Sequence, residues 1–132
     1  MSEGWASDID AMAAAFFADL AAARGDRAER LSVLGRARVQ DWLTELLDAP
    51  ERDEEAWSAI VRLIEVAPNQ QGLFDVAAGP LEDALQFHAD RFGERILGKA
   101  IADPRFRLAL NGVWGWERVA EPLRTKLTTL LR

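Results

Sequence analysis

The sequence contains no cysteine, no tyrosine and one histidine among its 132 residues. Without cysteine the chain can form no disulfide, no thiolate nucleophile and no cysteine-ligated zinc or iron–sulfur site. The serines, at positions 2, 7, 32 and 58, all stand outside the glycine-flanked elbow of the serine hydrolases. This poor inventory of catalytic groups argues against an enzyme, and we expect neither a cofactor nor a metal.

Long apolar segments are also missing. The apolar stretch over residues 11–23 is too short to span a bilayer, and it contains Asp19. The residues around its start, Glu3, Asp8 and Asp10, are acidic, whereas a signal peptide begins with a basic region. We therefore expect a cytoplasmic protein that does not bind membranes.

Basic residues are outnumbered by acidic ones, 16 to 22, which gives a net charge of −6. This balance opposes phosphate backbones, so we do not expect nucleic-acid binding. Residues 41–55 hold seven acids and one base, whereas residues 91–132 hold nine bases and four acids. The two regions can pair with each other, or the acidic region can form a face for a basic protein partner. The residues of this predicted acidic face are Asp41, Glu45, Asp48, Glu51, Asp53, Glu54 and Glu55.

Apolar residues recur at helical spacing in segments that end at glycine or proline. The predicted helices cover residues 8–24, 28–47, 53–66, 70–78, 80–93 and 94–102, and two more begin near residues 104 and 121. No segment shows the alternation of a β-strand. We predict one compact all-α domain over residues 1–132, with seven or eight short helices in antiparallel hairpins and an irregular solenoid-like stacking as one option.

Glycine and proline set most of the predicted helix ends. Gly79 is expected to stop one helix, and Pro80 fits the first position of the next, where its missing N–H is no loss. Gly93 is expected to end that second helix. Asp103 is predicted to cap the helix that begins at Pro104.

Two arginines lie in the first turn after this Asp103-Pro104 start. A cation there faces the unfavourable end of the helix dipole, so Arg105 or Arg107 is expected to meet a carboxylate. Glu82 is the candidate, in a clasp between two helix starts. The alternative is a cleft in which an arginine binds a carboxylate or phosphate ligand.

His88 has no acidic or imidazole residue three or four positions away, so it does not belong to a helical metal motif. It falls on an apolar stripe, which predicts a hydrogen-bonded histidine in the core.

The five tryptophans fall into two groups. Trp42 and Trp57 lie on inward-facing stripes and are predicted to be core residues. Trp5, Trp114 and Trp116 lie near a chain end or a glycine-rich break, where an indole tends to be exposed. Exposed tryptophan is typical of protein contact surfaces.

Several motifs then occur together and in order: Trp57, Gly79–Asp83, His88, Asp103–Arg107, Ala109-Leu110 and Val113-Trp114. Over residues 55–114 they resemble the signature of an uncharacterised bacterial domain family. The resemblance implies a bacterial origin and draws attention to Glu82, His88, Arg105 and Arg107, but it supplies no reaction. Members commonly carry glycine after the histidine; this chain has Ala89, which predicts that the helix continues to Gly93.

The leading hypothesis is a non-enzymatic interaction protein, of the immunity or antitoxin type, that engages a basic partner through the acidic face. One alternative is a ligand-binding or catalytic pocket around Glu82, His88, Arg105 and Arg107. Another is a homo-oligomer with Trp114 and Trp116 in its interface.

Overall fold

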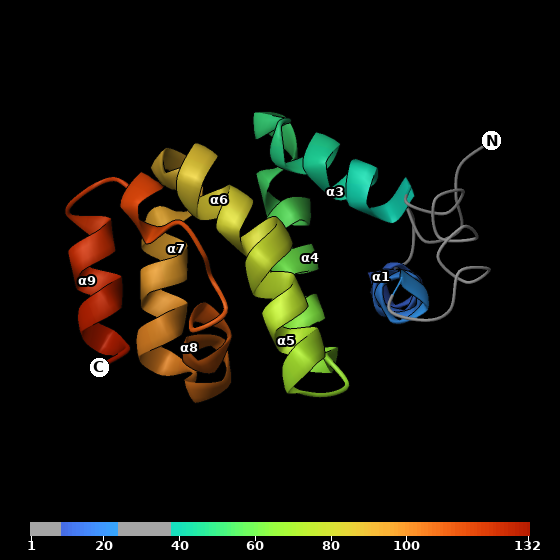
Figure 1. Cartoon of the computed structure of the whole chain (residues 1–132). Helices are drawn as coiled ribbons and strands as arrows, with labels where there is room; N and C mark the ends of the chain where they lie inside the picture. The colour runs from blue at the N-terminus through green and yellow to red at the C-terminus, as the bar shows by residue number, and fades with distance from the viewer. Residues whose placement is uncertain (1–8, 24–37) are drawn as a thin grey trace.

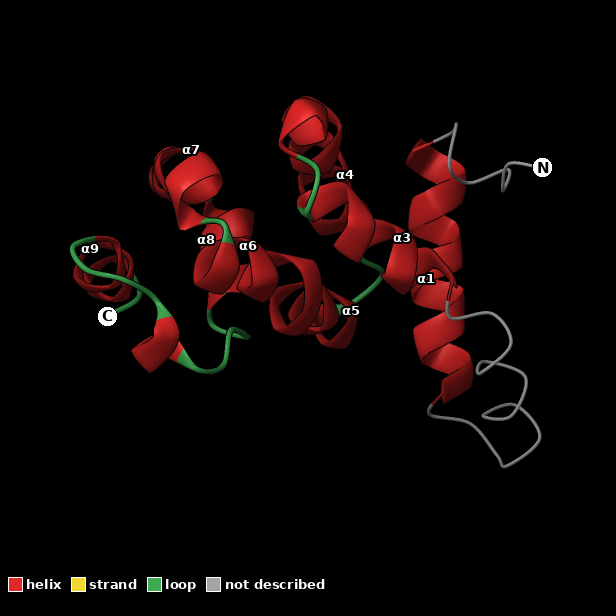
Figure 2. Cartoon of the chain, turned by 90° about the horizontal axis from the view of Figure 1, so that it is seen from above, coloured by secondary structure: helices red, strands yellow, loops and turns green. Residues whose placement is uncertain are grey.

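The computed structural model describes residues 9–23 and 38–132, and all regular elements in these residues are helical. The helices follow one another across the molecule, from α1 (Ile9–Ala23) at one end to α9 (Leu123–Leu130) at the other. Figure 1 and the view from above in Figure 2 agree on this arrangement. The predicted all-α class, with helices packed against each other, is confirmed.

The first half of the fold contains α1, α3 (Arg38–Leu47) and α4 (Asp53–Val66). A short 3₁₀ turn at Pro50–Arg52 joins α3 to α4. The helix predicted over residues 28–47 is described from Arg38 onward. Its first part, the predicted turn after α1, the cap before it and Trp5 lie outside the described residues.

The predicted break at Gly79 is confirmed. Helix α5 (Gln70–Val76) is followed by the turn Ala77–Leu81, which leads into α6 (Glu82–Phe87). The backbone is kinked at Gly79, where φ is −113° and ψ is −107°, values outside the helical region. Pro80 is buried and follows this kink directly, where its missing N–H is no loss.

The helix end predicted at Gly93 is wrong. The break falls at His88, whose φ of −135° and ψ of 27° separate α6 from α7 (Ala89–Ala102). Gly93 lies inside α7 and is buried. A Cβ on Gly93 would lie 3.0 Å from Leu123 Cδ2, so this glycine allows α9 to pack closely against α7.

The last third of the chain begins as predicted. The side chain of Asp103 accepts hydrogen bonds from the backbone N–H groups of Arg105, at 2.9 Å, and Phe106, at 3.4 Å. It thereby caps α8 (Pro104–Leu110). A loop follows, in which Gly115 has φ 68°, a left-handed conformation that favours glycine. A 3₁₀ turn at Trp116–Arg118 then leads to α9.

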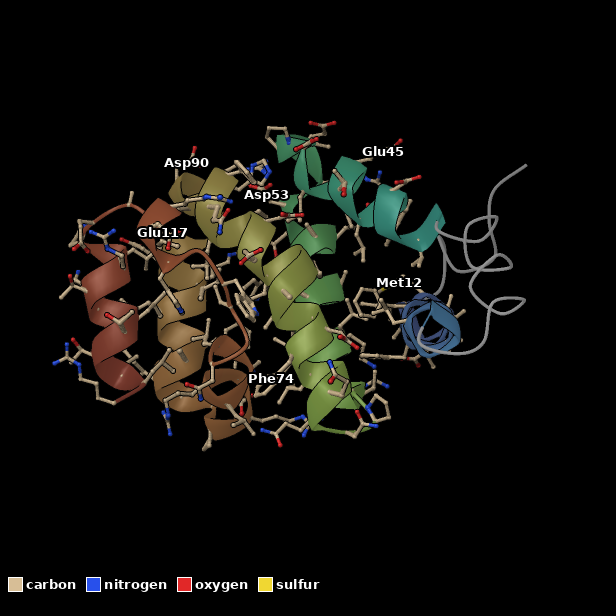
Figure 3. The ribbon with its side chains drawn as sticks, in the orientation of Figure 1. Met12, Glu45, Asp53, Phe74, Asp90 and Glu117 are labelled. Carbon is tan, nitrogen blue, oxygen red and sulfur yellow. The ribbon has the colours of Figure 1, made fainter. Side chains whose placement is uncertain are left out.

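The core runs through the whole series of helices. In Figure 3 Met12 points from α1 toward α4 and α5, and its side chain is fully buried. Trp42 and Trp57, predicted as core, are partly buried and pack against this core. Among the described residues, no helix has the length and apolar character needed to cross a membrane.

Candidate functional site

His88 sits where α6, α7 and the end of α3 come together. It follows α6 and precedes α7, and its Nε2 lies 3.2 Å from Asp48 Oδ1, just after the end of α3. The His88 side chain is 18% exposed, whereas that of Asp48 is 66% exposed. The histidine predicted to lie in the core is thus partly buried at a helix junction at the rim of the core, with Asp48 as a polar neighbour. Two residues that the sequence placed in separate groups are thus neighbours.

A small pocket of about 160 Å³ opens beside this pair. Thr44, Asp48 and Leu47 line it from the end of α3, and Asp83, Phe87 and His88 line it from α6. Drug-sized ligands generally need roughly 300–1,000 Å³, so this space suits a single side chain better than a metabolite. The Phe87 ring at its edge is 69% exposed.

Asp83 carries an electrostatic cost in this pocket. Burial raises the pKa of its carboxyl group above the usual value, and the nearby Asp48 raises it further, while His88 acts in the opposite direction. Asp83 forms no hydrogen bond or ion pair within the part of the chain that the structure describes. The pocket therefore holds a half-buried carboxylate whose charge is only partly offset by the nearby His88.

Arginines from α7 support the opposite side of this junction. Arg91 donates a hydrogen bond to the Leu47 carbonyl at the end of α3, and its Nη1 lies 3.2 Å from Asp53 Oδ1 at the start of α4. That buried oxygen accepts no hydrogen bond, so the Arg91–Asp53 contact is electrostatic and poorly aligned. Arg95 bonds Glu54. These contacts fix the junction and neutralise two members of the predicted acidic face.

The remaining members of that face divide into two kinds. Glu55 pairs with Arg52 at 2.8 Å, and this bond lowers the pKa of the Glu55 carboxyl group. Asp41, Glu45 and Glu51 are exposed and have no ion pair among the described residues. Figure 3 shows Glu45 on the outer side of α3 and Asp53 close to the helix junction. The unpaired part of the acidic face is therefore the outer surface of α3 and the turn that follows it.

The expected clasp between Glu82 and an arginine is not formed. Arg105 donates to the carbonyls of Ile64, at 2.7 Å, and Ala67, at 2.9 Å, at the end of α4. Arg107 donates to the Ala100 carbonyl at 2.8 Å, near the end of α7. Carbonyls at helix ends carry partial negative charge, so they satisfy both guanidinium groups without a carboxylate.

Glu82 instead holds the loop after α8. Its Oε1 accepts a hydrogen bond from the backbone N–H of Trp114 at 2.8 Å, and Gln86 Nε2 donates to the Trp114 carbonyl at 3.1 Å. Burial raises the pKa of Glu82, while the bond from Trp114 acts against this shift. The predicted group thus divides, since each of Glu82, His88, Arg105 and Arg107 has a different partner. None of the pockets given for the described residues is lined by more than one of the four.

The exposure of the tryptophans follows the prediction in part. Trp114 is 75% exposed, although its peptide groups on both sides are held by α6. Trp116 is partly buried and packs against the core. An exposed indole on a fixed backbone is a suitable anchor for another protein, because little order is lost on binding.

Three residues of the site were not singled out from the sequence for this role. Asp83 appears in the sequence only as part of the Gly79–Asp83 motif, and the sequence predicts no site role for Phe87 or Arg91. Asp83 and Phe87 are four positions apart on α6 and so share a face. This spacing was visible in the sequence, but the approach of α3 to that face was not. No group of acidic or histidine side chains in the described residues has an arrangement that can hold a metal ion.

Comparison with known proteins places the chain in a family. Searches of curated proteins and of solved structures give no match. A family model described as "Family of unknown function (DUF6869)" matches residues 32–130. This range includes the motifs over residues 55–114, so the resemblance drawn from them is confirmed. The chain belongs to this family of unknown function.

Proposed function

We propose that this chain is a non-enzymatic, cytoplasmic interaction protein, of the immunity or antitoxin type, that binds a basic protein partner. Its binding surface comprises the unpaired acids Asp41, Glu45 and Glu51 together with the pocket beside His88. The observation that carries the proposal is the half-buried Asp83 carboxylate, which has no hydrogen bond or ion pair among the described residues and shares its pocket with the exposed Phe87.

An arginine side chain from the partner fits this pocket chemically. Its guanidinium group can bond the carboxylates of Asp83 and Asp48, and its flat face can stack on Phe87. The positive charge offsets the repulsion between the two carboxylates, which otherwise raises the pKa of Asp83. A lysine ammonium group supplies the charge but neither the planar fork nor the stacking surface, so arginine is preferred.

The acids on α3 have a different role in the proposal. Because Asp41, Glu45 and Glu51 are exposed and form no ion pair with another described residue, they can attract a basic surface from a distance. Charges of this kind chiefly raise the association rate and make it sensitive to salt. Trp114 adds an exposed apolar contact on the neighbouring loop.

The proposal is tested by NMR titration of the full chain with two short peptides of equal length and charge, one rich in arginine and one rich in lysine. The arginine peptide is expected to bind more tightly and to shift the amide signals of Asp83, Phe87 and His88. Asp83→Asn is expected to remove the preference for arginine, whereas Glu45→Lys weakens both peptides.

The control for the charge change is Glu65→Lys, at an exposed glutamate near the far end of α4 that pairs with Arg62 at 3.1 Å. It should leave the binding of both peptides nearly unchanged. Equal effects of the Glu45 and Glu65 substitutions would contradict an acidic face on α3. Arginine and lysine peptides that bind alike, with no shift near Asp83, would contradict the pocket.

A further inference from the structure

A second groove lies between α7 and the segment that leads into α9. Its volume is about 480 Å³. Leu97 and Ile101 from α7 and Pro122 and Leu123 from the α9 side give it an apolar lining. It uses neither the acidic face nor the pocket beside His88.

The walls of this groove leave apolar surface in water. Ile101 is 60% exposed, and Leu123 is partly buried. Helix α9 has eight residues, and Leu127 is its fully buried side chain. Short helices depend on tertiary packing for stability, so α9 has much to gain from further burial. Figure 1 shows α9 at the edge of the molecule, with α7 on its inner side.

The charges on the two walls have opposite signs. Asp90 and Glu94 are exposed on the α7 wall, and Lys126 is exposed on the α9 wall. None of the three forms an ion pair with another described residue. The other carboxylate of the lining, Glu121, is already engaged, since it accepts a hydrogen bond from the Thr125 backbone N–H at 2.9 Å.

We propose that this groove is the contact surface of a homodimer. A two-fold axis through the groove brings the α7 wall of one copy against the α9 wall of the other. Asp90 and Glu94 then face Lys126 of the second copy, and the reverse pairing forms at the same time. Ile101 and Leu123 of both copies are buried between the walls, and α9 is covered on its open side.

The charge pattern favours a second copy over a basic helix from another protein. A basic helix would match Asp90 and Glu94, but it would meet the like charge of Lys126 on the opposite wall. A second copy matches both walls. Each charge pair at the rim is weak, so the apolar floor provides most of the binding and the charges fix the register.

Sedimentation velocity of the full chain over a range of concentrations tests the proposal. The chain of 14.7 kDa is expected to sediment as a dimer that dissociates on dilution. Ile101→Asp should give a monomer. Its matched control is Leu108→Asp, which changes a hydrophobic residue on α8 that is 43% exposed and lies outside the groove lining, and it should leave the dimer intact.

A charge swap tests the pairing itself. Glu94→Lys alone or Lys126→Glu alone should weaken the dimer roughly tenfold, because each change affects both symmetric contacts. The double variant carrying both changes should restore it. A wild-type chain that stays monomeric would overturn the proposal, as would a dimer that Ile101→Asp leaves intact or a double variant no tighter than the single ones. A monomer whose basic partner binds less tightly after Ile101→Asp would assign the groove to that partner instead.

Discussion

The carboxylate of Glu82 in α6 holds the backbone N–H of Trp114, 32 positions later in the chain, at 2.8 Å. Gln86, one turn further along α6, holds the carbonyl of the same residue. A loop with an exposed indole is thereby fixed to a helix through its peptide groups alone. The indole is left free for an external contact.

Glu82→Ala is expected to loosen this loop. Loss of a hydrogen bond to a charged group at this half-exposed position should lower the free energy of unfolding by about 1 kcal/mol. Faster hydrogen exchange at the Trp114 amide, followed by NMR, measures the local effect. Glu117→Ala removes a neighbouring exposed acid whose side chain forms no hydrogen bond among the described residues, and it should leave that exchange rate unchanged.

Asp83→Asn is expected to stabilise the chain at neutral pH. The pKa of Asp83 is raised in the folded state, so ionisation opposes folding once the pH exceeds this raised pKa. The opposition disappears as the pH falls toward 3.8, the ordinary value. Because solvent screens this half-open site, Tm should rise by only about 1–3 °C.

The rise in Tm from Asp83→Asn should become smaller as the pH falls, because protonation also removes the negative charge of Asp83 in the wild-type chain. Thermal unfolding at several pH values measures it. A lower Tm for the variant at neutral pH would show that the carboxylate stabilises the fold, which is the reverse of the expected sign.

Arg105→Ala is expected to lower the free energy of unfolding by about 2 kcal/mol, because two charge-assisted hydrogen bonds to the end of α4 are lost. Arg105→Lys should retain only part of this free energy, because an ammonium group lacks the planar fork of hydrogen-bond donors. Chemical denaturation measures both. Arg118→Ala, at an exposed arginine, is the control with an expected change below about 0.5 kcal/mol.

Gly112→Ala is expected to destabilise the loop after α8 by roughly 1–3 kcal/mol. A Cβ at this position would lie 2.7 Å from Phe74 Cδ1 and 2.9 Å from Phe74 Cβ. Phe74, labelled in Figure 3, would have to move. The double variant Gly112→Ala/Phe74→Leu should lose less free energy of unfolding than the two single variants lose in sum. Simple additivity, measured by denaturation, would show that the two positions do not interact.

The fold class and many helix ends could be predicted from the sequence, because they depend on local chemistry. Asp103 caps α8 through groups two and three residues away, and Asn69 caps α5 in the same way. Gly79, predicted as a helix end, lies at the kink between α5 and α6. Gly93 was predicted as a helix end but lies inside α7, because tertiary packing decides its role: it makes room for Leu123.

The site could be predicted only as separate pieces. Asp48 and His88 were both singled out, but their contact joins α3 to the end of α6 and depends on how those helices cross. The partners of Arg105 are backbone carbonyls, which carry no residue-specific signal in the sequence. The dipole argument therefore predicted a carboxylate partner, Glu82, whose own partner is also a backbone group.

The turn between α5 and α6, Ala77–Leu81, also determines the direction in which each face of α6 points. Each residue advances a helix by about 100°. Deleting Ala78 would therefore rotate the side chains of α6 by about 100° around the helix axis. Glu82 and Gln86 would then leave the Trp114 loop, while Asp83 and Phe87 would turn away from α3. A single-residue change in the length of this turn would thus disrupt both the contact of α6 with the Trp114 loop and the pocket between α6 and α3, without altering any side chain in either.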